Sequence, residues 1–138
     1  RGDEMIKILD LNHVTIVSRD VDASRWFYCG VLGMKELPHP ASFTHTTVWF
    51  RQGSAEIPLV AEPDSTQKPG DPPTHPEGER DWSKARHFAL AVEDIGAAVE
   101  TLAEHDIPVV LGPRDRGDGI TQMFCYDPDG YLIELHTL

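Results

Sequence analysis

Two stretches of this chain decide its fold: LNHVTIVSRDVDAS, residues 11–24, and ARHFALAVEDIGAA, residues 85–98. They align without a gap at a constant offset, which places His13 over His87 and Asp20 over Asp94. Self-similarity of this kind is typical of a duplicated structural unit. In each copy a short polar–apolar alternation predicts a half-buried strand, and the Asp after it is a favoured residue at a helix N-terminus.

The pattern continues in the same order after each stretch. We expect two helices, at 21–32 and 95–104, and six further strands, at 34–37, 44–51, 56–61, 109–111, 121–126 and 131–137. Each copy is therefore predicted to be a β-α-β-β-β module. The fold class is α+β, with two pseudo-symmetric βαβββ modules forming a curved, cup-like mixed sheet and the helices outside.

Between the two copies lies a stretch rich in Pro and Gly, which suits neither a helix nor a central strand. We expect a single domain over residues 5–138, divided into a module at 5–62, a linker at 63–83 and a module at 84–138. The chain has 138 residues, a length that fits one domain with a real core.

The charge of the chain argues against some classes of partner. The sequence has 23 acidic and 12 basic residues and a formal net charge of −11. Such a surface is not attracted to phosphate backbones or anionic lipids, so neither nucleic acid nor a membrane is an expected partner. No signal-length or membrane-spanning apolar stretch occurs, and we expect a cytoplasmic protein. Cys29 and Cys125 share no metal-type spacing and are expected to be reduced thiols.

Three residues form the candidate metal site: His13, His87 and Glu134. The histidines occupy equivalent positions in the two copies, which two unrelated structural histidines have no reason to do. Glu134 lies between Ile133 and Leu135, so its carboxylate points to the opposite face of its strand from these apolar neighbours. Two imidazoles and a carboxylate suit one divalent ion such as Fe, Mn, Zn or Ni, although each residue alone is more often structural.

The last strands of the two copies also match, because EIPLV at 56–60 aligns with LIELH at 132–136. Pro58 then stands opposite Glu134 and offers no atom to a metal. Glu56 lies two residues earlier on the same face, where it is a candidate general base or displaced ligand, or else an exposed strand carboxylate. The sequence does not fix whether Trp49 faces the cup or the core, and core packing is favoured.

The paired NHV and RHF strand starts, together with YDPDGYLIEL at 126–135, resemble the vicinal oxygen chelate superfamily. That superfamily includes glyoxalase I, epimerases, fosfomycin-resistance transferases, extradiol dioxygenases and bleomycin-resistance proteins. The resemblance implies metal ligands at His13, His87 and Glu134, and it implies a homodimer. It places Pro58 at the usual fourth ligand position, which weakens an assignment to glyoxalase I itself. Residues 127–130, DPDG, are expected to form the tight turn before the last strand.

Two functions remain open, and a former enzyme whose site has decayed, as Pro58 suggests, is a third possibility. The first is a metal-dependent lyase, isomerase or dioxygenase that acts on a small substrate through neighbouring oxygens, with Glu56 or a water moving the proton. The second is a metal-free binding protein of the bleomycin-resistance kind, which would hold a cationic small molecule in an acidic cleft. The three ligand-type residues favour the enzyme, whereas the net charge favours the binding protein.

Overall fold

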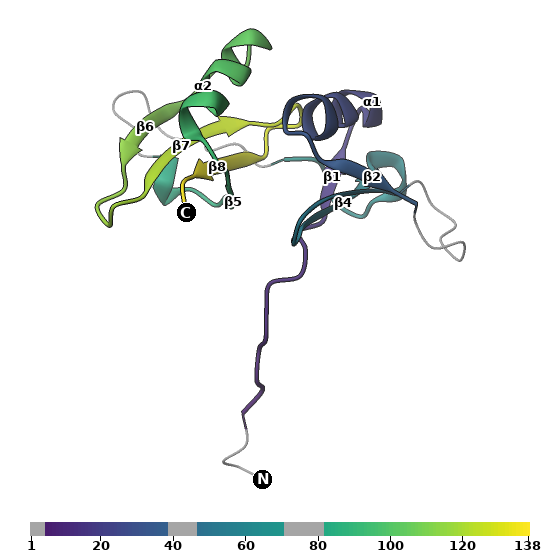
Figure 1. Cartoon of the computed structure of the whole chain (residues 1–138). Helices are drawn as coiled ribbons and strands as arrows, with labels where there is room; N and C mark the ends of the chain where they lie inside the picture. Colours follow the sequence, from purple (N-terminus) through teal and green to yellow (C-terminus); the bar gives the residue numbers. More distant parts are fainter. Residues whose placement is uncertain (1–4, 39–46, 71–81) are drawn as a thin grey trace.

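The computed structural model describes residues 5–38, 47–70 and 82–138 of the chain (Figure 1). The first module contains six elements: β1 (Ile16–Ser18), α1 (Val21–Arg25), the π-helical turn η1 (Trp26–Val31), β2 (Lys35–Leu37), β3 (Thr47–Gln52) and β4 (Ala55–Ala61). The second contains five: β5 (Phe88–Ala91), α2 (Ile95–Glu104), β6 (Leu111–Asp115), β7 (Thr121–Tyr126) and β8 (Leu132–His136). Two short 3₁₀ turns, η2 (Glu62–Asp64) and η3 (Trp82–Lys84), lie between them.

The strands form two four-stranded sheets of identical topology, in the orders β1-β4-β3-β2 and β5-β8-β7-β6. In each sheet the first strand pairs in parallel with the last, and the remaining pairs are antiparallel. The register is also shared, because Ile16 pairs with Leu59 and Leu90 pairs with Leu135. The predicted α+β fold of two βαβββ modules is confirmed.

Both helices begin where the sequence predicts. Asp20 accepts hydrogen bonds from the backbone N–H groups of Asp22 and Ala23, and Asp94 accepts one from Ala97, so each side chain satisfies donors that the first helical turn leaves unpaired. The helix predicted at 95–104 is found at those residues. The helix predicted at 21–32 changes to a π-helical turn after Arg25 and ends at Val31.

The second strand of the second module differs from its prediction. It runs over Leu111–Asp115 instead of 109–111. Its pairing with β7 shifts register between Leu111 and Arg114, around Gly112 and Pro113, and then resumes. A bulge of this kind accommodates Pro within an edge strand. Parts of two other predictions, residues 44–46 of a strand and 71–81 of the linker, lie outside the described residues.

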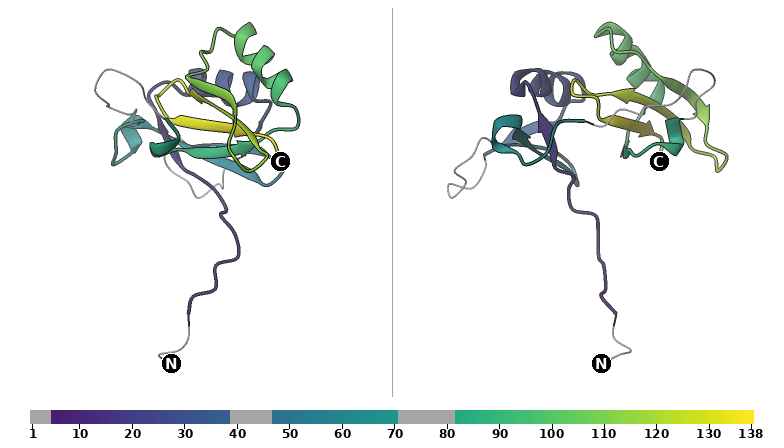
Figure 2. Two further views of the ribbon diagram at one scale, coloured as in Figure 1. Left: turned by 90° about the vertical axis from the view of Figure 1, so that its left-hand side faces the viewer. Right: turned by 180° about the vertical axis from the view of Figure 1, so that it is seen from behind.

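The core lies between the sheets and their helices. The inward positions of β4 and β8 hold Ile57, Leu59, Ile133 and Leu135, all at most 2 % exposed. The helices lie over the same side of the two sheets and leave the other side uncovered (Figures 1 and 2). Because side chains alternate along a strand, the residues between these core positions, Pro58 and Glu134, point to the uncovered side.

The turn before β8 joins the two modules. Its hydrogen bond from the Gly130 N–H to the Asp127 carbonyl confirms the predicted turn. Its side chains also bind the first module: Tyr28 donates to Asp127 Oδ2 over 2.7 Å, and the Arg19 N–H donates to Asp129 Oδ1 over 2.9 Å. Both carboxylates are buried. We call Asp127, Asp129 and their partners the intermodule clasp.

The clasp includes further polar contacts at the module boundary. The Ser24 hydroxyl donates to Asp129 Oδ2 over 3.4 Å, and the Tyr131 hydroxyl accepts from the Val17 N–H over 2.9 Å. Burial raises the pKa of Asp127 to about 6, although the hydrogen bond from Tyr28 opposes this. Within residues 5–38, 47–70 and 82–138, no helix has the length and apolar character needed to cross a membrane.

Candidate metal centre

In the second module, His87 and Glu134 face each other across the edge of the sheet. The His87 Nδ1 lies 2.7 Å from the Ala85 carbonyl oxygen, and Nε2 lies 3.1 Å from Glu134 Oε1. A carbonyl can only accept, so Nδ1 carries a proton. Nε2 then either carries a second proton, which it donates to Glu134, or offers its lone pair, in which case the two atoms are a pair of ligand atoms for one metal ion.

The spacing of these two atoms fits a shared ion. Nitrogen and oxygen ligands bind divalent ions at about 2.1 Å, so two ligands of one ion lie about 3.0 Å apart at the right angle of an octahedral site and about 3.4 Å apart at a tetrahedral angle. The Nδ1–carbonyl bond is also the contact that orients metal-binding histidines in proteins. His87 and Glu134 therefore fit two positions of a divalent metal site.

Glu134 is held as a buried carboxylate, only 5 % exposed. Gln122 Nε2 donates to its Oε2 over 3.2 Å, and Arg116 Nη1 lies 3.5 Å from the same oxygen. Burial of a carboxylate is costly unless it is paired and hydrogen-bonded, and these neighbours supply both. Arg116 also forms an ion pair with Asp118 over 2.7 Å, which lowers the pKa of Asp118.

An apolar wall lies beside the imidazole. The edge of the Phe124 ring meets the His87 ring with centroids 5.1 Å apart, and Phe124 pairs directly with Glu134 in the sheet. The next residue, Cys125, is fully buried; burial, with the charge of Asp127, raises the pKa of its thiol to about 12. Both Cys29 and Cys125 are free, as predicted, and Cys125 cannot supply a thiolate near neutral pH.

The first module carries a different set of side chains on its uncovered face. Trp49 Nε1 donates to Glu56 Oε1 over 3.0 Å, and the Trp49 and His13 rings lie 5.9 Å apart. His13 is exposed and bonds to Asn12 Oδ1 over 2.7 Å. Trp49 pairs with Pro58, as Phe124 pairs with Glu134, so the predicted equivalence of Pro58 and Glu134 holds in the register. Trp49 lies beside Glu56, not in the core.

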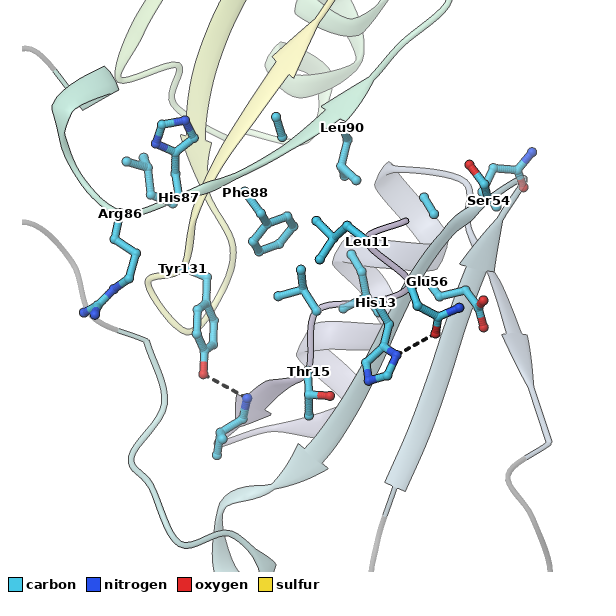
Figure 3. Close-up of a pocket in the computed structure, with 18 of the residues that line it drawn as sticks. Leu11, His13, Thr15, Ser54, Glu56, Arg86, His87, Phe88, Leu90 and Tyr131 are labelled. Atoms are coloured by element: carbon cyan, nitrogen blue, oxygen red, sulfur yellow. Dashed lines mark hydrogen bonds between the residues drawn. The ribbon is translucent and has the colours of Figure 1, made fainter. Parts of the chain in front are cut away.

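The two halves do not meet within this chain. Figure 3 shows the His13 and His87 rings pointing away from each other, with Phe88 between them. Both histidines line one pocket of about 1230 Å³ at the junction of the modules. Among the described residues, no group of three or more His, Cys, Asp or Glu side chains is placed to hold a metal ion. The structure thus joins His87 to Glu134 and leaves His13 and Glu56 apart from them.

Sequence reasoning did not assign Gln122 or Arg116 to these half-sites, and it favoured the core for Trp49. Gln122 and Trp49 lie on the inner strands. Alternation along these strands tells which residues share a face, but it does not tell which of the two faces the helices cover. The internal alignment contained a usable signal, because it fixes the face of Glu134, and the cross-strand register then assigns Gln122 and Phe124 to the same face. Arg116 follows β6 in a loop, where no periodicity applies.

Comparison with known proteins now gives the family. The family model of the Glyoxalase/Bleomycin resistance protein/Dioxygenase superfamily matches residues 10–135. The chain belongs to this superfamily. The family resemblance read from the sequence is thereby confirmed.

Relatives and solved structures agree with this superfamily. A probable lactoylglutathione lyase from Synechocystis is 32% identical over 133 residues, or 91% of this chain and 92% of that protein. Glyoxylase I 4 from Arabidopsis thaliana is 29% identical over 94% of this chain and 71% of its own length. The crystal structure of a putative glyoxalase family protein from Bacillus anthracis matches with a TM-score of 0.73 at 22% identity, covering 97% of this chain and 98% of that one.

Proposed function

We propose that this superfamily member is a divalent-metal-dependent lyase or isomerase that acts on a small substrate through two neighbouring oxygens. The proposal rests on one observation: His87 Nε2 and Glu134 Oε1 face each other at 3.1 Å, while the Ala85 carbonyl holds the imidazole through Nδ1. A divalent ion satisfies both atoms. The relatives named lactoylglutathione lyase and glyoxylase support the reaction class.

His87 and Glu134 would hold the ion, which would act as a Lewis acid toward substrate oxygens. The protein's own contribution is orientation and proton movement. The Ala85 carbonyl would fix the imidazole, and Gln122 and Arg116 would hold the carboxylate in place. The Phe124 ring packs against the imidazole.

We infer that the third ligand, His13, comes from a second copy of the chain in a homodimer. His13 is exposed and lies apart from His87 in its own chain. The segment before it carries five exposed large apolar side chains, at least 76 % exposed, and such a cluster favours contact with a partner: Met5, Ile6, Ile8, Leu9 and Leu11. Two copies related by a two-fold axis would form two complete sites, each from a first module and a second module.

Glu56 would then enter the same site as His13 and move the substrate proton. Trp49 donates to one of its oxygens, Oε1, which orients the carboxylate and leaves Oε2 to accept a proton. Pro58 offers no ligand atom at the position equivalent to Glu134, so Glu56 is the carboxylate that β4 presents on this face.

The first experiment is metal content and affinity in untagged protein. We expect about one ion per chain and a loss of at least 100-fold in metal affinity in His87→Ala and Glu134→Gln. The control is His105→Ala, which should leave the affinity unchanged because His105 bonds to the Thr101 carbonyl on α2. If the wild-type chain stays empty after addition of Mn, Fe, Ni or Zn, the enzyme proposal fails. Binding of a cationic small molecule by that metal-free protein would support the bleomycin-resistance alternative.

Mixing two inactive variants tests the shared site. In a heterodimer of His13→Ala and His87→Ala subunits, one site carries both substitutions and the other carries neither. We expect the mixed sample to regain metal binding that each variant lacks alone. If each chain builds its own site, mixing restores nothing.

A further inference from the structure

Gln122 is a buried residue of the candidate metal centre that contacts Glu134 directly. Its side chain is 2 % exposed on β7 and lies between two charged groups. Arg114 Nε donates to its Oε1 over 3.1 Å, while its own Nε2 donates to Glu134 Oε2 over 3.2 Å. Arg114 is itself held by Ser83, whose hydroxyl lies 3.3 Å from Nη2. The side chains thus form one connected path from Ser83 to Glu134.

The two neighbours leave the Gln122 amide a single orientation. A guanidinium group has only donors, and an ionised carboxylate has only acceptors. The amide oxygen must therefore face Arg114, and the amide NH₂ must face Glu134. A flipped amide would set donor against donor on one side and acceptor against acceptor on the other, both in a buried place where unsatisfied groups are costly.

The two carboxylate oxygens of Glu134 consequently have different partners. Its Oε2 faces Gln122 and Arg116, whereas its Oε1 faces His87 Nε2. One oxygen is committed to protein donors and the other remains directed at the candidate ion. Oε1 is therefore the Glu134 oxygen that would be offered to an ion held with His87.

The repeat supports a link between the amide and the carboxylate. Gln122 pairs with His136 in the second module, and Thr47 pairs with Val60 at the equivalent point of the first. The first module therefore has Thr47 and Pro58 where the second has Gln122 and Glu134. The module that lacks the carboxylate also lacks the amide that would hold it.

We propose that Gln122 is a positioning residue for the metal-binding carboxylate, and that Arg114 sets the orientation of the Gln122 amide. This inference rests on the proposed function, because it gives Gln122 a role in ion affinity. Neither residue is assigned a contact with substrate. The role of Gln122 is to keep Glu134 in one rotamer with Oε1 directed at His87.

The test compares Gln122→Met, Arg114→Met and the control Gln52→Met by titration calorimetry with Mn, Ni and Zn. Methionine matches the length of glutamine and removes the donor, and Gln52 is an exposed glutamine on β3 of the other module. Outer-shell contacts to metal ligands typically affect affinity by 10- to 100-fold. We expect a loss of about tenfold or more in Gln122→Met, a smaller loss in Arg114→Met, unchanged stoichiometry, and no loss in the control. Thermal melts check that each variant is folded.

A second readout needs no metal. In the wild-type protein the Gln122 side-chain NH₂ should exchange slowly with solvent by NMR, and Arg114→Met should speed this exchange. If the wild-type chain binds no ion, the proposed function fails, and slow exchange that Arg114→Met abolishes would still support the positioning arrangement. Rapid exchange in the wild type, or metal affinity unchanged in a folded Gln122→Met, would overturn the inference.

Discussion

In the second module β8 places Glu134 beside His87, whereas in the first module β4 places Pro58 at the equivalent point, opposite Trp49. The strand order and register around both positions are the same. The core-facing neighbours of both residues are Ile and Leu. Duplication has therefore preserved the packing face of the strand while the uncovered face has changed, because only the packing face is constrained by the core.

The modules also differ in the turn before the last strand. The first module closes β3 to β4 with a short hairpin at 53–54, while the second places residues 127–131 between β7 and β8. The longer turn supplies the two buried carboxylates that bind Arg19, Ser24 and Tyr28. One module thus provides the docking group and the other receives it.

Asp129→Ala should have the largest effect on stability. It removes the hydrogen bonds that the buried carboxylate accepts from the part-buried Arg19 N–H and from the Ser24 hydroxyl, which keeps only its contact with Ser18, and this should lower the free energy of unfolding by about 3 kcal/mol. Urea denaturation measures this directly. Ser54→Ala, in the exposed hairpin of the first module, is the matched control and should change stability by less than about 0.5 kcal/mol. A loss below about 1 kcal/mol in Asp129→Ala would mean that the clasp does not hold the modules together.

Tyr28→Phe should cost about 2 kcal/mol, because a hydrogen bond to a buried charged group is lost while the ring packing is kept. Tyr131→Phe, which removes only the contact with the Val17 N–H, should cost about 1 kcal/mol. Denaturation curves of both variants at pH 7 give the comparison. An equal or reversed order would show that the charge of Asp127 adds nothing to the clasp.

Asp127 should make stability depend on pH. Its folded pKa of about 6 lies above the ordinary value of 3.8, so the folded chain binds the proton more tightly than the unfolded chain. Its contribution is therefore present below about pH 4 and is lost as pH rises through about 6, with a slope of at most about 1.4 kcal/mol per pH unit. The measurement is the difference in unfolding free energy between wild type and Asp127→Asn from pH 4 to 7. A flat difference across this range would contradict the expectation.

Pro58→Glu should restore the missing carboxylate of the first module. If this module faces the ion in a dimer, the new side chain should tighten metal binding three- to tenfold, or about 1 kcal/mol. Pro58→Ala separates the effect of the carboxylate from the loss of proline. Equal affinities in the two variants would show that the uncovered face of β4 does not reach the ion.

The sequence by itself determined the duplicated βαβββ plan, the limits of α2 and β7 and the equivalence of Pro58 with Glu134. Periodicity and a repeated His-to-Asp stretch carry this information, because they reflect local structure and the apolar face of each strand. The turn at 127–130 was also readable, since Asp, Pro and Gly favour such turns through local backbone preferences.

Only the tertiary structure decided what the side chains meet. The clasp joins Tyr28 to Asp127 across 99 positions of the chain. His87 meets Glu134 across 47, and no local pattern records such contacts. The transition to a π-helical turn after Arg25 and the register shift in β6 likewise depend on packing and pairing with distant strands. The separation of His13 from His87 is the clearest case: the repeat makes the two residues equivalent, but the packing of one module on the other sets where each ring points.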